Sequence, residues 1–593
     1  MRESAGSTQP AQPDAPRPPP REMTVRAFVV ALLVAALMGA AEPAVVLRIG
    51  YGPNMSVVSA FLGFIAISLV GLVTRRRGTR FENNLVQTAG TAAGSGVGFM
   101  AVVLAAIDML NQRGLLALHL SSLQIFSWLA PSGLLGVLLA VPFRKHYIDH
   151  ENLTFADGTA AGETLLVLDE GPRQAGPRVA ALGIGGGLSA ALTFLRDGLG
   201  AIPGAIPFAF ATPHAAALRV GTEVGVLSLG AGMLIGARVT LSMGLGMVLA
   251  WIVAPGPLLA RGLVPELTFN AVLQRWIMWP ATGLMVAGGL AALALKWRVI
   301  AKTFRGLGGE EAARSGDLPM RWVVSGSVAA AVTLAVVQKI SLGFPLWLSA
   351  VSVGLSILLM LVGIRVLGET NWAPISAMAN VMQAVFALLA PGHVPINMIG
   401  SGMSGSVAAN GEHLMQDYRA GKIVGSTNRN LTLLQLVGVP VGALAVAVAY
   451  PLLRDTYGIG GEGGLTSPIS VKWAGFAELL AQGFGALPRS AFQALLLAVV
   501  VGVALTLLES TRIGSIVPSP TAVGLGMLIP GFAVFPMIVG GVGQALWRRF
   551  APRSEAVYDI PLASGFITGE ALLLLALAVV SQVAPHLLRA GGH

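Results

Sequence analysis

Cysteine is absent from this chain of 593 residues, and charged residues make up only 11% of it. Without cysteine the chain can have no disulfide, no thiolate nucleophile and no zinc–thiolate site. Soluble domains carry about 25% charged residues. The low charge and the 54% apolar content therefore exclude an ordinary soluble protein, and they predict an integral membrane protein with many helices.

Several enzyme motifs are missing as well. The chain has no Gly-x-x-x-x-Gly-Lys-Ser/Thr phosphate loop, no His-Glu-x-x-His pair and no Gly-x-Ser-x-Gly elbow. No nucleophile, base and orienting group can be assembled from the apolar runs. We therefore expect no enzyme, no cofactor and no resident metal, and any active transport has to draw on an ion gradient.

The net charge of +10 lies mostly in short loops between apolar runs. Such a pattern indicates membrane topology and contact with anionic lipid headgroups, and it does not indicate nucleic-acid binding. Arginines precede the first apolar run, follow the second and fourth runs, and fill the segment 296–321. The positive-inside rule then predicts a multi-pass protein of the cell (inner) membrane with both termini in the cytoplasm.

Apolar windows predict an all-α polytopic membrane protein with about sixteen transmembrane helices, eight in each half. The 75 Gly and 35 Pro residues further predict broken or re-entrant segments. One expected helix covers 214–237, and the run 516–546 contains four prolines and is expected to be discontinuous. The expected organisation is a disordered cytoplasmic tail 1–22, a first transmembrane repeat 23–295, a basic cytoplasmic linker 296–321 and a second transmembrane repeat 322–593.

Three short matches between the halves predict an internal duplication. Residues 82–85, 230–235 and 282–283 recur as 369–372, 524–529 and 568–569, at displacements of 287, 294 and 286. Because each half has an even number of predicted helices, both halves should share one orientation. Duplicated halves place a substrate between them near the membrane midplane, which favours a transporter.

Polar residues at the boundaries of the apolar runs are candidates for the substrate pathway, where amides would hydrogen-bond a polar substrate and carboxylates would bind protons or cationic groups. The alternative is that they cap helix N-termini. The candidates are Glu82, Asn83, Asn84, Gln87, Asp157, Glu163, Glu369 and Asn371.

Glycines spaced by four, at 158 and 162 and again at 421 and 425, accompany these polar residues. Such spacing suits a re-entrant half-helix whose N–H groups bind an anion. It suits equally a tight contact between two helices.

Carboxylates inside apolar runs are candidates for proton coupling, because burial makes a carboxyl group exchange its proton closer to neutral pH. The candidates are Glu42, Glu223 and Glu570. The alternative for each is a structural ion pair, and Arg219 lies four residues before Glu223.

Several of these motifs, taken in order along the chain, resemble the oligopeptide transporter family, which includes the yellow-stripe-like metal-chelate transporters. The chain looks like one of the bacterial members. The resemblance extends from about residue 27 to the end and rests on five segments: 82–88, 157–163, 368–376, 417–425 and 565–570.

This resemblance implies an ion-coupled, proton-driven secondary transporter that imports small oligopeptides or peptide-like metal chelates. Its partners would be that small-molecule substrate, protons and the lipid bilayer. The alternative is a passive channel or facilitator for a small polar solute, and the sequence is compatible with either a monomer or a homodimer.

Overall fold

The structure is a computed structural model that describes most of the chain: residues 22–49, 55–174, 176–295, 316–460, 465, 467–481, 488–514 and 516–583. The tail predicted over 1–22, apart from Glu22, lies outside the described residues. So does most of the predicted linker, from 296 to 315.

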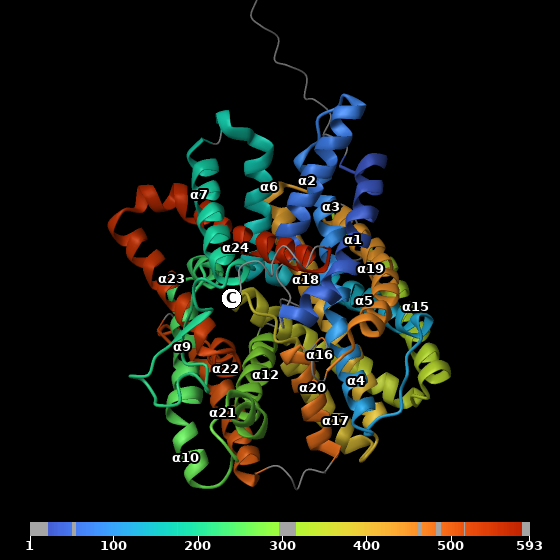
Figure 1. Cartoon of the computed structure of the whole chain (residues 1–593), viewed down its shortest axis with the longest axis vertical. Helices are drawn as coiled ribbons and strands as arrows, with labels where there is room; N and C mark the ends of the chain where they lie inside the picture. Colours follow the sequence, from blue (N-terminus) through green and yellow to red (C-terminus); the bar gives the residue numbers. More distant parts are fainter. Residues whose placement is uncertain are drawn as a thin grey trace, which may run out of the picture.

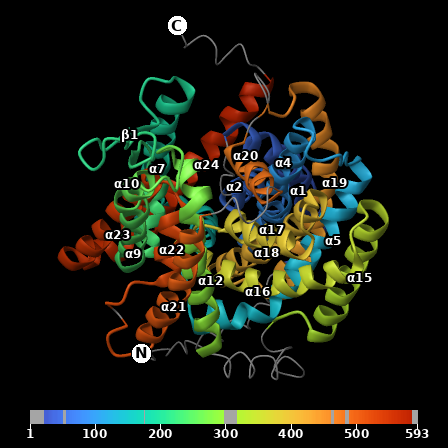
Figure 2. The same cartoon turned by 90° about the horizontal axis from the view of Figure 1, so that it is seen from below.

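Helices from distant parts of the chain form two lobes that lie side by side (Figures 1 and 2). One large cluster of buried apolar side chains lies mostly in lobe 1, and a second fills lobe 2 and extends into lobe 1, where it includes Phe344, Val362 and Met382. Lobe 1 consists of α1 (Val25–Ile49), α2 (Met55–Thr74), α3 (Arg80–Thr91), α4 (Ala101–Gln112), α5 (Ser122–Ala140), α15 (Met320–Leu342), α16 (Leu346–Thr370), α17 (Ile375–Leu389), α18 (Val394–Val424), α19 (Asn428–Tyr457) and α20 (Pro468–Ala481).

Lobe 2 combines the later helices of each half of the sequence. It consists of α7 (Gly176–Thr193), α8 (Leu227–Ile235), α9 (Ala237–Val248), α10 (Pro255–Ala260), α11 (Phe269–Val272), α12 (Met278–Leu295), α21 (Arg489–Glu509), α22 (Pro520–Leu528), α23 (Gly531–Phe550) and α24 (Pro552–Val583). The helix α6 (Ala156–Gln174) contacts α2 and α18 of lobe 1 as well as α7 and α24 of lobe 2. Each half of the sequence therefore contributes to both lobes.

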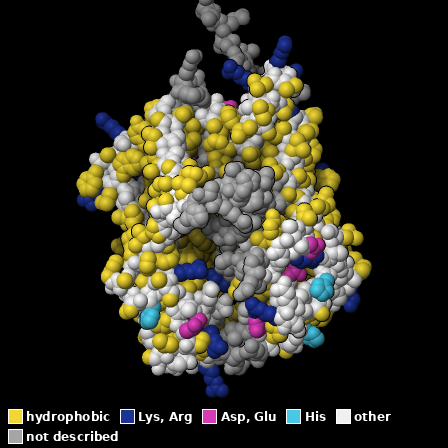
Figure 3. Space-filling view, viewed as in Figure 1, with side chains coloured by type: hydrophobic (Ala, Val, Ile, Leu, Met, Phe, Trp, Pro, Cys, Tyr) yellow, Lys and Arg dark blue, Asp and Glu magenta, His cyan; other side chains and the backbone are white. Residues whose placement is uncertain are grey.

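Eleven helical segments among the described residues are long and apolar enough to cross a membrane. The chain is thus an all-α multi-pass membrane protein, apart from one short hairpin. The number falls below the sixteen expected helices partly because some predicted spans are short or polar: α8 and α22 have nine residues each, and α18 is rich in Gly, Ser and Asn. Figure 3 shows apolar side chains over the middle and upper part of one face, with most acidic and histidine side chains of that face near its lower end.

The predicted helix over 214–237 is wrong in its first part. An antiparallel hairpin of β1 (Ala205–Pro207) and β2 (Gly221–Glu223) precedes α8, which begins only at Leu227. Pro213 lacks an amide proton, and Arg219 and Gly221 have φ angles of 56° and 157°, which a right-handed helix does not allow. The expected break in 516–546 is present, since α22 ends at Leu528 and α23 begins after Pro530.

Glycines in lobe 2 allow helices of the two halves to meet at backbone distance, and these contacts are reciprocal. A Cβ atom on Gly232 of α8 would lie 2.1 Å from the Met537 carbonyl oxygen of α23. A Cβ on Gly526 of α22 would lie 2.0 Å from the carbonyl oxygen of Met243 in α9. Both members of the second contact are offset by 294 residues from their counterparts in the first, which is also the displacement of the 230–235 match.

Lobe 1 also has two close contacts between helices from the two halves of the sequence. A Cβ on Gly136 of α5 would lie 2.3 Å from the Val407 carbonyl oxygen of α18, and a Cβ on Gly442 of α19 would lie 2.5 Å from the Cα of Ala93. Ala93 belongs to the π-helical segment η1 (Ala92–Val97), which, with the short η2 (Gly98–Met100), joins α3 to α4. The run of small residues from Gly90 to Gly98 is therefore an interrupted helix in the protein interior, as π-helical turns often are at functional positions.

Candidate functional site

A carboxylate without any cationic partner lies at the centre of lobe 1. Asp417 is in the second half of α18 and is fully buried. The side-chain amide of Gln87, from α3, donates to Asp417 Oδ1 at 2.6 Å, and the amide of Gln435, from α19, donates to Asp417 Oδ2. Among the described residues no Lys, Arg or His forms an ion pair with it, so two neutral amides from two different helices satisfy this carboxylate.

The surroundings of Asp417 are polar and equally buried. The Gln87 amide also donates to Thr91 Oγ1 at 2.9 Å, and Thr91 Oγ1 donates to Ser56 Oγ at 3.2 Å. The amide oxygens of Gln87 and Gln435 have no hydrogen-bond partner in the described part of the chain. Since an amide can rotate to present either its N–H or its oxygen, this cluster can accept hydrogen bonds from a protonated Asp417 as well as donate to the ionised form.

Further unpaired polar groups lie where α18 contacts the π-helical segment. Asn410 donates to the Gly96 carbonyl at 3.2 Å and to the Ser406 carbonyl at 2.8 Å, and its own oxygen has no partner in the described structure. Both carboxylate oxygens of Glu412 and one of Glu42 are likewise buried without a described partner. Glu42, the first coupling candidate, packs its side chain against Gly98.

Two further pathway candidates lie on α3 near Gln87. Asn84 donates to Ser426 Oγ at 2.8 Å. Glu82 accepts from Thr24 at 2.5 Å, forms an ion pair with Arg26 at 2.6 Å and completes a capping box with Thr79. Glu82 therefore has the structural role that the alternative interpretation gave it, whereas Gln87 belongs to the Asp417 cluster.

Asp157 and Asn371, which the sequence separates by 214 residues, are hydrogen-bonded to each other. The Asn371 side chain donates to Asp157 Oδ1 at 2.6 Å and accepts from the Asp157 amide at 2.9 Å. Asn371 ends α16 in the left-handed conformation, with φ of 58°, and Asp157 stands in the first turn of α6. Asn371 thus ends α16 with its backbone and caps α6 with its side-chain amide.

Glu369, the last residue but one of α16, lies in an ion-pair cluster. Arg365 contacts Glu369 Oε1 at 2.7 Å and Glu151 Oε2 at 2.6 Å, and Glu151 also faces His146 Nε2 at 3.1 Å. Ser519 and Thr521 donate to the other oxygen of Glu369, so α16 is tied to the start of α22. Because Glu369 closes a helix and Glu82 opens one, the match between 82–85 and 369–372 does not join structurally equivalent positions.

Two of the remaining candidates, Glu163 and Glu570, have arginine partners. Glu163 pairs with Arg178 of α7. Glu570 accepts from Arg196 at 2.8 Å and from the Leu227 amide at 3.3 Å. Glu223 lies in β2, outside the candidate spans, where burial raises its pKa to about 7, the Ser228 hydrogen bond opposes this and the nearby Glu570 adds to it. The partner suggested by sequence spacing was wrong, because the Arg219 guanidinium lies over the Phe269 ring instead.

The Gly-x-x-x-Gly segment at 158–162 mediates a helix contact. It belongs to the continuous helix α6, where a Cβ on Gly158 would lie 2.3 Å from the Gln416 carbonyl oxygen and one on Gly162 would lie 3.1 Å from Ala420 Cα. This contact fixes α6 against α18 one residue from Asp417. Of the two interpretations of the glycine spacing at 158 and 162, the tight helix contact is the one the structure has.

Sequence reasoning missed the role of Asp417 and Gln435. Apolar windows do not identify the second half of α18, which runs to Val424 and contains Glu412, Asp417 and Arg419. The signal that could have found it is the density of small residues from Gly400 to Gly411, resumed at Ala420 and Gly421, which is typical of a helix packed closely against others. The part of the chain that the structure describes contains no group of three or more His, Asp or Glu side chains arranged to hold a metal ion.

Comparison with known proteins agrees with this architecture. Residues 22–581 match the family model described as OPT oligopeptide transporter protein. A metal-nicotianamine transporter of Arabidopsis thaliana is 23% identical over 646 aligned positions that cover 96% of both chains. The iron-phytosiderophore transporter yellow stripe 1 of Zea mays is 24% identical, with 93% of this chain and 89% of the maize protein covered.

A third relative is a putative oligopeptide transporter of Saccharomyces cerevisiae. It is 24% identical over 412 aligned positions, which cover 58% of this chain and 56% of the yeast protein. The family model covers nearly all of the chain, including both lobes and the Asp417 cluster. The chain therefore belongs to the OPT oligopeptide transporter family, and it is a membrane transporter and not an enzyme.

Proposed function

We propose that this protein is a proton-coupled secondary transporter that imports small oligopeptides or peptide-like metal chelates across the cell membrane. Family membership supports transport, and the relatives named for metal–nicotianamine and iron–phytosiderophore support a chelate as the substrate. Both kinds of substrate are small molecules rich in carboxylate, amine and amide groups, which a pathway of amides can hydrogen-bond.

The Asp417 cluster is the observation that carries the proposal of proton coupling. An ionised carboxylate buried without a cation is unfavourable by several kcal/mol, and uptake of a proton removes that cost. Asp417 is such a group, and in the described structure Gln87 and Gln435 donate hydrogen bonds to it. Because these amides belong to α3 and α19, protonation of Asp417 changes the hydrogen bonds that join three helices, which links proton binding to helix movement.

The other coupling candidates differ in their partners. Glu42 resembles Asp417, since it is buried beside the π-helical segment without a described partner for Oε2. Glu570, in contrast, forms an ion pair with Arg196. Glu223 lies beside this pair with a pKa near 7. We propose Asp417 and Glu42 as the principal coupling groups and assign Glu223 and Glu570 a smaller, local role.

We further propose that the chain is an internal duplication, with repeats before and after the linker 296–321. The reciprocal contacts of Gly232 with Met537 and of Gly526 with Met243 support it, because a twofold relation between repeats produces such pairs. The substrate then passes along the polar groups between helices of both repeats, including Asn84, Gln87 and the Asp157–Asn371 pair. Cytoplasmic termini remain part of this proposal.

Uptake into proteoliposomes tests the function. A mixed short-peptide pool and an iron-chelate pool are offered side by side under an inward proton gradient, with and without a protonophore, and wild type is compared with Glu369→Gln. Accumulation of one pool that disappears when the gradient is collapsed would support the proposal and identify the substrate class. Equilibration without accumulation, unchanged by the protonophore, would instead mean a passive facilitator.

A further inference from the structure

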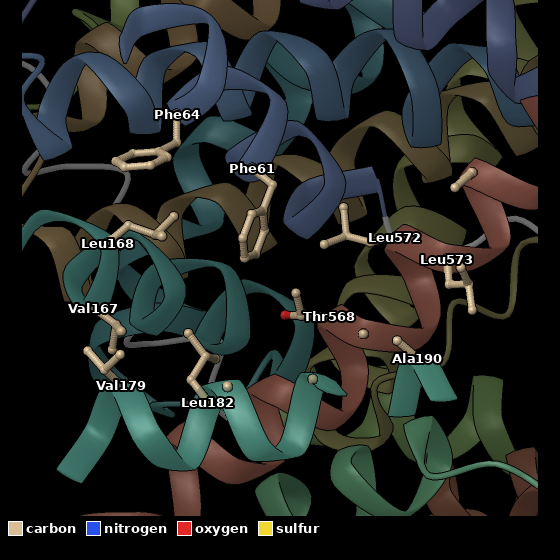
Figure 4. Close-up of a pocket in the computed structure, with 14 residues that line it drawn as sticks. Phe61, Phe64, Val167, Leu168, Val179, Leu182, Ala190, Thr568, Leu572 and Leu573 are labelled. Atoms are coloured by element: carbon tan, nitrogen blue, oxygen red, sulfur yellow. The ribbon is translucent and has the colours of Figure 1, made fainter. Parts of the chain in front are cut away.

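Two adjoining cavities lie where α2 and α6 meet, and α7 and α24 complete the larger one. The larger cavity has a volume of about 620 Å³. Figure 4 shows the side chains of Phe61, Leu182 and Leu572 around it, contributed by α2, α7 and α24. Every lining residue except Thr568 is apolar or glycine, so this cavity suits a hydrocarbon.

The smaller cavity, of about 330 Å³, has a different chemistry. Four arginines line it at the connection between α2 and α3: Arg75, Arg76, Arg77 and Arg80. Both cavities share Phe64 and Leu168 in their walls. An apolar space is therefore continuous with a cationic one at the end of a candidate membrane span.

These arginines are available to a ligand. In the described structure the guanidinium groups of Arg75, Arg76 and Arg77 are exposed and form no ion pair, and Arg80 lies over the Phe81 ring at 5.1 Å. The guanidinium of Arg26 donates to the carbonyl oxygens of Arg76 and Arg77, at 2.8 and 2.7 Å, and so holds the connection in place. The four arginines therefore form an exposed, positively charged cluster on an ordered connection.

Two other polar residues line the smaller cavity. Asn83 is only 5% exposed, and its side-chain oxygen has no hydrogen-bond partner in the described residues. Asp169 is an exposed carboxylate. Four guanidinium groups against one carboxylate leave a strong positive excess next to a buried, incompletely satisfied amide.

We propose that this pair of cavities is a binding site for an anionic phospholipid. The phosphate group lies among the arginines, and an acyl chain occupies the larger cavity. The apolar cavity rejects a soluble anion, which has nothing to place there, and the charge excess discriminates against zwitterionic lipids. Lipid bound here contacts α2 of lobe 1, α7 and α24 of lobe 2, and α6 between them. It thereby adjusts the separation of the two lobes.

Native mass spectrometry of the delipidated protein tests the charge requirement. Phosphatidylglycerol and phosphatidylcholine with identical acyl chains are titrated separately, and we expect preferential retention of phosphatidylglycerol. The triple variant Arg75→Gln, Arg76→Gln, Arg77→Gln should lose that preference by about tenfold or more. The matched control replaces Arg548, Arg549 and Arg553 by Gln, which removes the same charge from exposed positions of α23 and α24, and it should retain the preference.

A second pair of variants tests the apolar cavity. Gly183 lines it and a Cβ there would meet no atom within 4 Å, so Gly183→Phe fills the cavity without a backbone clash. Gly187→Phe is the control, because Gly187 also has open space and does not line the cavity. We expect loss of phosphatidylglycerol binding only in the first. Equal binding of both lipids by wild type, equal competition by soluble glycerol phosphate, or unchanged binding in Gly183→Phe would overturn the proposal.

Discussion

Asp417 is fully buried and Glu369 is largely buried, with 11% of its side chain exposed, and the two carboxylates have different partners. Asp417 accepts hydrogen bonds from two neutral amides, Gln87 and Gln435. Glu369 is paired with Arg365 and accepts from two hydroxyl groups. The comparison teaches that the partners of a carboxylate matter as much as its depth: Glu369 has a fixed cation beside it, whereas two amides can donate to an ionised Asp417 or accept from a protonated one.

The largest expected effect follows from removing the ionisable group at Asp417. Asn at this position keeps the shape and the hydrogen-bonding capacity, so Asp417→Asn should fold, but it cannot exchange a proton. We expect gradient-driven accumulation to fall by about tenfold for each pH unit of the imposed gradient, because each unit supplies about 1.4 kcal/mol only if the proton is coupled. Exchange of labelled for unlabelled substrate across the membrane should continue. Unimpaired accumulation in the variant would show that another group couples the proton.

In the ion-pair cluster around Arg365 we expect a substitution to reduce stability. Arg365→Met leaves Glu369 and Glu151 without their cation, and breaking a buried pair by removing one partner costs about 3–5 kcal/mol. We expect a lower thermal unfolding temperature in detergent, and Arg365→Met combined with Glu369→Gln should recover part of the loss. If the single variant were as stable as wild type, the cluster could not have the structural role assigned to it.

The pH dependence of stability distinguishes Glu223 from Asp417 and Glu369. Burial raises its pKa in the folded protein to about 7, from an ordinary value of 4.5. The folded state then binds more protons than the unfolded state between these values, so this group's contribution makes stability fall as pH rises from about 4.5 to 7. Between about pH 5 and pH 8 the unfolding temperature of Glu223→Gln should fall less than that of wild type. Parallel curves for the two proteins would contradict this assignment.

The smallest effect is expected at Asn371, which ends one helix and caps another. Asn371→Ala removes both hydrogen bonds to Asp157 and places alanine in a left-handed conformation. A loss of stability of about 1–2 kcal/mol is typical of a lost cap, and Asn371→Gly should restore part of it, because glycine tolerates positive φ. Thermal unfolding of the two variants measures the difference; equal losses would assign the whole effect to the missing hydrogen bonds.

Much of the architecture could be predicted from composition. Low charge and long apolar runs identify a multi-pass membrane protein, and the prolines of 516–546 predict the break between α22 and α23. The hairpin before α8 was not predicted. The apolar content of residues 214–237 favoured a helix, although Pro213 and Gly221 are signals against one. The two-lobe arrangement could not be predicted either, since it depends on contacts between helices hundreds of residues apart.

The candidate site was predicted only in part. Gln87 was identified as a buried polar side chain, but its partner Asp417 is 330 residues away, and no local pattern links them. Glu82 has polar neighbours in the sequence like those of Gln87, but in the structure it caps α3 and pairs with Arg26. What separates these two positions is the partner each one meets in space, which is a property of the fold.

Proton movement during transport tests the central claim most directly. Wild type and Asp417→Asn are reconstituted in proteoliposomes that contain a pH-sensitive dye, and substrate is added outside with no imposed proton gradient. We predict that substrate entry through wild type acidifies the lumen, and that the variant lets labelled substrate exchange with no pH change. Lumen acidification of equal size in both proteins would contradict the assignment of proton coupling to Asp417.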